Sequence, residues 1–235
     1  MRICVVSLLL VAVLPGAVLG AGLNLSWDGC GALGTENKMV PCDSLDGTVT
    51  LYGSFVAPPG ITGLYGASFV VDIGAPRGMT LPPWWDLAPG GCRSGTLSVS
   101  YSTGGGCRTA WSSPLGRFEF TRVDSDRIRL EGSVEIYNET AVDVPEGEER
   151  TLFAIQLRLP EGIACDGCER GVCMLLESAV LFTSTGHVPL DAAARRNWVT
   201  WQQAFVSTCG CASRTDRILC PVEHISWGQL KSTYR

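Results

Sequence analysis

The stretch RIRLEGSVEI, Arg127–Ile136, decides the fold class, because its side chains alternate between polar and apolar. Its apolar positions are Ile128, Leu130, Val134 and Ile136. Successive side chains of a β-strand point to opposite faces, so this period of two predicts an antiparallel strand with one buried face.

The same alternation recurs along the chain. TLFAIQLRL (151–159) repeats it, and shorter runs are TVTLYGSFV (48–56), SFVVDI (68–73), TLSVSY (96–101), RFEF (117–120) and NWVTW (197–201). CMLLESAVLF (173–182) is apolar on both faces, which favours a central, covered strand. Turns rich in Gly, Pro and Asp separate these runs. About eight short strands predict an all-β, two-sheet antiparallel β-sandwich of the jelly-roll or cohesin/carbohydrate-binding-module type.

The two ends of the chain carry different signals. Residues 1–20 combine Arg2, an apolar run and small residues near Gly20, which is the pattern of a signal peptide. Residues 21–235 are then expected to form a single β-sandwich domain that is secreted, extracellular or periplasmic, with no transmembrane segment after leader cleavage. The closing SWGQLKSTYR (226–235) predicts a short C-terminal helix.

Cysteine usage supports export. Cleavage would remove Cys4 and leave ten cysteines, Cys30, Cys42, Cys92, Cys107, Cys165, Cys168, Cys173, Cys209, Cys211 and Cys220. An even number in an exported chain predicts a disulfide-stapled fold, although CDGCERGVC (165–173) alone would also suit a zinc site or a redox pair. Sequence spacing suggests the pairs Cys30–Cys42 and Cys92–Cys107, with the other six joined in the C-terminal third.

The segment LPPWWDLAPGGC (81–92) is the candidate ligand-binding loop. Two prolines precede Trp84 and Trp85 and would stiffen the loop, so that the indoles could stack on a sugar ring at little entropic cost. Asp86 could accept a hydrogen bond from a hydroxyl group. The competing interpretation is that the rings cover one end of the sandwich, because tryptophan is usually largely buried.

Other functions have less support. The formal net charge is −5 and no basic run occurs, so nucleic acid is not an expected partner. No metal site or cofactor is predicted, although Asp and Glu in 42–47, 124–126 and 146–149 leave calcium as an alternative. No catalytic residue is predicted, because neither Gly-x-Ser-x-Gly nor His-Glu-x-x-His occurs. Asn24 and Asn138 fit the N-glycosylation pattern.

Several segments together resemble a known group of proteins. They are LNLSWDGCG, SFVAPPGI, LPPWWDL, CDGC…VC, NWVTWQ and SWGQLKSTYR. They resemble a group of secreted, cysteine-rich bacterial β-sandwich proteins over most of the mature chain. The resemblance implies export and a bacterial source, and it assigns no activity. In its fold the chain is similar to cohesin-like and carbohydrate-binding modules, which does not establish function.

Three functions are compatible with these observations. The first is a secreted, non-catalytic binding or scaffolding module that contacts a glycan or an extracellular protein through the aromatic loop. The second is a structural component of the cell envelope or extracellular space with no small ligand. The third is a glycoside hydrolase whose carboxylate pair would come from strand residues such as Glu131, Glu135 and Glu177.

Overall fold

A computed structural model describes residues 20–43, 46–76, 79–102, 104–137, 141–159 and 165–202. The predicted leader, the predicted C-terminal helix, Cys209, Cys211, Cys220 and Asn138 lie outside these residues. In the described part of the chain, no helix has the length and hydropathy needed to cross a membrane.

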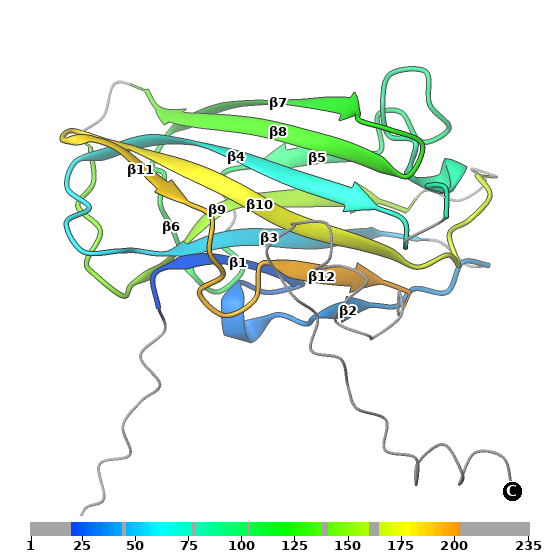
Figure 1. The fold of residues 1–235 in the computed structure, drawn as a ribbon, viewed down its shortest axis with the longest axis horizontal. Helices are drawn as coiled ribbons and strands as arrows, with labels where there is room; N and C mark the ends of the chain where they lie inside the picture. Colours follow the sequence, from blue (N-terminus) through cyan, green and yellow to red (C-terminus); the bar gives the residue numbers. More distant parts are fainter. Residues whose placement is uncertain are drawn as a thin grey trace, which may run out of the picture.

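The fold is all-β and consists of two sheets (Figure 1), which confirms the predicted class. The five-stranded sheet has the order β1 (Gly22–Trp27), β3 (Thr48–Val56), β9 (Glu149–Arg158), β5 (Leu97–Ser100), and β6 (Arg108–Thr109) also pairs with β9. The seven-stranded sheet has the order β2 (Asn37–Lys38), β12 (Trp198–Trp201), β10 (Val172–Thr183), β4 (Leu64–Gly74), β8 (Arg127–Ile136), β7 (Pro114–Arg122), and β11 (Gly186–Leu190) also pairs with β10. The two described helices are single 3-10 turns, η1 (Gly31–Leu33) and η2 (Pro83–Trp85).

The core lies between the two sheets, where the inward faces of the alternating strands meet. Phe69 on β4 stacks on Phe153 on β9, with ring centroids 4.0 Å apart. Glycine on a neighbouring strand makes room for each ring, because a Cβ at Gly132 would overlap Phe69 and a Cβ at Gly53 would overlap Phe153. The two rings thus pack between the sheets at positions where the neighbouring strand has a glycine.

All the alternating runs quoted above correspond to strands of the structure. The apolar positions of Arg127–Ile136 follow the prediction, since Ile128, Leu130 and Val134 are buried in β8. Strand β10 is buried on both faces only over its first five residues, 172–176. Beyond a β-bulge at Glu177 its outward side chains become partly accessible. The prediction of a strand covered on both faces therefore holds for its first half.

Three disulfides join loops that are distant in sequence, Cys30–Cys107, Cys42–Cys168 and Cys92–Cys165. Cys173 is disulfide-bonded as well. The predicted pairs Cys30–Cys42 and Cys92–Cys107 are wrong, because strand pairing, not sequence proximity, decides which loops meet. The CDGC segment therefore holds disulfide sulfurs, and not a zinc site or a dithiol.

Candidate functional site

The predicted aromatic loop is not a binding surface. Trp84 and Trp85 form η2 and are 1% and 0% exposed, so neither ring offers a face to a sugar. They pack against Trp201, with centroids 4.8 Å and 5.5 Å away, and Trp201 also contacts Trp27. We call Trp27, Trp84, Trp85 and Trp201 the tryptophan cluster. The stacking prediction is wrong, because the proline-stiffened loop folds inward and its indoles complete the core.

Asp86 ends the same 3-10 turn and does not act with the indoles on a ligand. Its backbone N–H donates to the carbonyl of Pro83, and its carboxylate lies 3.7 Å from the guanidinium of Arg122. An exposed pair at this distance contributes little to stability. The residues predicted to bind a ligand thus form part of the core and a surface ion pair.

A buried arginine lies beside the tryptophan cluster. The guanidinium of Arg93 is centred 3.7 Å from the ring centroid of Trp84, and its Nη2 donates to the carbonyl of Arg158. Desolvation by burial lowers the pKa of Arg93 to about 10, so the side chain remains charged at neutral pH. The cation–π contact offsets part of the cost of burying this charge.

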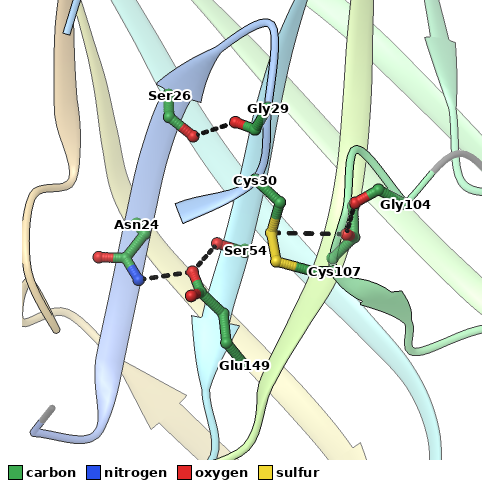
Figure 2. Close-up of a disulfide and its surroundings, with 9 residues drawn as sticks. Asn24, Ser26, Gly29, Cys30, Ser54, Gly104, Cys107 and Glu149 are labelled. Carbon is green, nitrogen blue, oxygen red and sulfur yellow. Dashed lines mark hydrogen bonds between the residues drawn. A yellow bond between two sulfur atoms is a disulfide. The ribbon is translucent and has the colours of Figure 1, made fainter. Parts of the chain in front are cut away.

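A second polar cluster surrounds the Cys30–Cys107 disulfide on the outer face of the five-stranded sheet (Figure 2). The Oε1 atom of Glu149 accepts hydrogen bonds from Asn24 Nδ2 at 2.8 Å and from Ser54 Oγ at 2.6 Å. A Cβ at Gly31 would overlap the Glu149 carboxylate, and Gly31 has φ +55°, so glycine is needed there. The carboxylate therefore links β1, β3 and β9 beneath η1.

This cluster does not suit a metal ion or a glycan. Cys30, Cys107 and Glu149 are the one group of three potential metal ligands within 4.8 Å among the described residues, but both sulfurs belong to the disulfide. The Oδ1 atom of Asn24 accepts hydrogen bonds from the backbone N–H groups of Arg195 and Arg196, and the side chain is buried. Asn24 is therefore not available for N-glycosylation.

Acidic side chains in two of the segments considered for calcium are engaged within the protein. Asp124 Oδ1 accepts a hydrogen bond from the N–H of Asp126 at 3.1 Å, as in an Asx turn, and Asp124 lies 3.6 Å from Arg127. Glu148 pairs with Arg150 at 3.1 Å. Calcium binding by these groups stays an alternative that the structure does not test.

Replacing Glu149 by alanine should lower the free energy of unfolding by about 1–3 kcal/mol, because Asn24 Nδ2 and Ser54 Oγ would lose their acceptor. Glu149→Gln keeps an amide oxygen at the same place and should cost less than about 1 kcal/mol. Guanidinium chloride unfolding followed by circular dichroism measures both. Equal losses in the two variants would contradict this role for the carboxylate oxygen.

The outer face of the seven-stranded sheet contains a groove of about 600 Å³. It crosses β10, β4, β8 and β7, and cross-strand register places its outward side chains in two rows. The rows are Val180, Ser68, Ser133, Arg117, and Ser178, Val70, Glu131, Glu119. Small side chains thus make the floor over β10 and β4, and charged ones make the wall over β7 and β8.

A network of ion pairs lies on the same face, in the cross-strand row next to the groove. Asp72 on β4 is buried and receives two hydrogen bonds from Arg129, at 2.8 Å and 3.0 Å, and one from Arg127. Hydrogen bonding to Asp72 raises the pKa of Arg129 above its usual value, and Arg129 also donates to Glu177 at the β10 bulge. This network holds the end of the groove in one geometry.

The structure separates the carboxylates considered for hydrolysis. Glu177 is paired with Arg129, and Glu135 lies opposite Gly66, outside the residues that line the groove. Glu131 lines the groove and faces Glu119 across the β7–β8 pair. Glu119 was not among the residues predicted from the sequence, although its alternation with Arg117 and Thr121 places all three on one strand face.

Comparison with known proteins concerns the fold alone. No protein-family model and no curated protein matches the sequence. A cohesin module from the Clostridium perfringens ATCC13124 family 33 glycoside hydrolase is similar, with a TM-score of 0.38, 9% identity, and coverage of 77% of this chain and 92% of that chain. The sixth cohesin of Acetivibrio cellulolyticus scaffoldin B, solved in complex with a Cel5 dockerin mutant, is similar with a TM-score of 0.34 and 9% identity. The match covers 77% of this chain and 97% of that chain. At these values the likeness assigns no partner and no binding surface to this chain.

Proposed function

We propose that the protein is an exported, non-catalytic binding module that holds a protein partner against the outer face of its seven-stranded sheet. The observation that carries this proposal is the groove over β10, β4, β8 and β7. Its volume of about 600 Å³ is in the range of ordinary ligand sites. Regular strands build it, so the surface is formed before a partner arrives and binding costs little ordering entropy.

The chemistry of the groove favours a protein over a flat sugar. Its side chains are small residues flanked by Arg117, Glu119 and Glu131, so both signs of charge are offered within one concavity. Phe118 also lines it, but strand alternation turns this ring to the inner face, where Phe118 packs against Phe120. A partner that carries charged and polar side chains matches such a surface, and its charges would set its orientation.

Export is supported by two independent features. The first 20 residues have the composition of a leader. Three disulfides, with their cysteines 73 to 126 residues apart, staple the described part of the chain, and such bonds persist in oxidising compartments. A surface or secreted protein is therefore the expected class of partner.

A site-specific photocrosslinker tests the proposal. We expect a crosslinker at Ser178, on the groove floor, to capture one discrete protein from the surface fraction of the producing cells. Ser98 on β5 is the matched control, because it is an exposed strand serine on the other sheet. Adding Ser133→Trp, which fills the groove, should abolish capture at Ser178. Equal capture at both positions, or capture that survives Ser133→Trp, would reject the groove as the binding surface.

One observation favours glycan hydrolysis as a second candidate function. Glu119 and Glu131 are direct cross-strand neighbours, whose Cβ atoms are expected about 4.5–5.5 Å apart. Retaining glycosidases hold two carboxyl groups about 5–5.5 Å apart. Release of reducing sugar from a glycan panel, abolished by both Glu119→Gln and Glu131→Gln, would replace the binding module by a hydrolase.

A further inference from the structure

Strand β7 ends the seven-stranded sheet and leaves one backbone edge open. Among the described strands it pairs only with β8, and in Figure 1 it lies along the upper border of the ribbon. Leu115 and Phe118 on it are 59% and 38% exposed. An uncovered strand of nine residues is a template for pairing with another strand.

The hydrogen bonds to β8 define which backbone groups face outward. Val123 N–H donates to the carbonyl of Arg127, and Tyr137 N–H donates to that of Ser113. The register has no bulge, so the odd-numbered residues of β7 bond to β8. The N–H and C=O groups of Gly116, Phe118 and Phe120 therefore point to the open edge, where no described residue bonds them.

Two side chains on this strand lack an opposite charge within the described part of the chain. Glu119 faces Glu131 across β7–β8, and like charges placed directly opposite are destabilising. Arg117 donates from Nε to Ser133 Oγ at 3.3 Å and forms no ion pair with any described residue. In a second copy of β7, Glu119 could offer its charge to Arg117 of the first copy, and Arg117 could offer its charge to Glu119 of the first copy.

Only one antiparallel register between two copies of β7 provides this. The open-edge groups must pair with each other, so the even-numbered residues of one copy lie opposite even-numbered residues of the other. Centring the pair on Phe118 places Arg117 of each copy opposite Glu119 of the other, which gives two such pairs. Shifting the centre by one residue places Arg117 opposite Arg117 or Glu119 opposite Glu119, which charge repulsion disfavours.

The other face of β7 is compatible with the same register. Phe118 would lie opposite Phe118 of the second copy, and Phe120 opposite its Gly116, whose inner face the Tyr101 ring covers. The Arg117–Glu119 pairs are non-hydrogen-bonded pairs, in which side chains approach most closely. Backbone direction and charge thus agree on one twofold arrangement.

We propose that the protein forms a twofold dimer by antiparallel pairing of β7 with β7 of a second copy, centred on Phe118. The two seven-stranded sheets then become one continuous sheet. The interface is isologous, because each copy supplies the same residues to the other. The dimer shares Arg117 and Glu119 with the wall of the groove. Its test needs no groove partner, so either proposal can fail without the other.

Charge exchange tests both the dimer and its register. Sedimentation analysis of the full chain over a concentration series should show a dimer that weakens as salt rises. Arg117→Glu alone and Glu119→Arg alone should each weaken dimerisation on the order of 10- to 100-fold. The double exchange R117E/E119R should restore it, and an equimolar mixture of R117E and E119R chains should form the heterodimer.

Arg108→Glu on β6 is the matched control, because it makes the same charge change at an exposed site of the other sheet and should leave the dimer intact. Circular dichroism confirms that each variant is folded. A wild-type chain that stays monomeric, or single variants that dimerise as the wild type does, would overturn the proposal. If neither the mixed chains nor the double-exchanged chain forms a dimer, the proposed register is wrong.

Discussion

Trp201→Ala is expected to lower the free energy of unfolding by about 3–5 kcal/mol. The indole is fully buried and contacts Trp27, Trp84 and Trp85 at centroid distances of 5.9, 4.8 and 5.5 Å. Its Nε1 donates to the carbonyl of Cys168 at 2.8 Å, and this acceptor would also lose its partner. The remaining rings come from two separate segments, Trp27 from β1 and the adjacent Trp84 and Trp85 from η2, which limits how far they can close the cavity.

Trp198→Ala is the matched control for this prediction. It lies on the same strand, β12, but on the opposite face, and its side chain is only partly buried. Its loss should therefore cost less than about 1.5 kcal/mol. Urea unfolding followed by far-ultraviolet circular dichroism measures both without relying on tryptophan fluorescence. A loss for Trp201→Ala no greater than that for Trp198→Ala would show that the cluster does not anchor this end of the core.

The fold class could be predicted because most strands bury one face. In β8 and β9 the apolar residues recur at every second position, and the core lies on that side. Strand β1 was missed although LNLSW alternates, because it follows the leader directly and its polar members Asn24 and Ser26 are buried too. Their burial depends on η1 and the 192–197 segment, which reach β1 from elsewhere in the chain.

The candidate sites could not be predicted in the same way, because they depend on contacts between distant segments. Nothing in PPWW tells whether the loop turns toward the core, and the partner that buries it, Trp201, is more than 100 residues away. The groove requires the register of four strands, and its key pair, Glu119 and Glu131, is recognised only once β7 and β8 are aligned. Local alternation defines faces, and non-local pairing decides which faces form a site.

The double variant Cys42→Ser/Cys168→Ser is expected to lose about 4–5 kcal/mol in the chain-entropy account, because this bond closes a loop of 126 residues. The bond also fixes the segment after the two-residue strand β2, which has little strand pairing of its own. Guanidinium chloride unfolding without reductant measures the loss.

The other two bonds separate the entropic effect from a local one. Cys30–Cys107 and Cys92–Cys165 close loops of 77 and 73 residues, so the entropic account predicts losses within about 0.5 kcal/mol of the first. A much larger loss for Cys42→Ser/Cys168→Ser would mean that this bond also holds the backbone of Cys168 in place as the acceptor for Trp201. A loss below about 1 kcal/mol would mean that strand pairing alone positions the 38–43 segment. The Cys42–Cys168 disulfide would then add little to the free energy of unfolding.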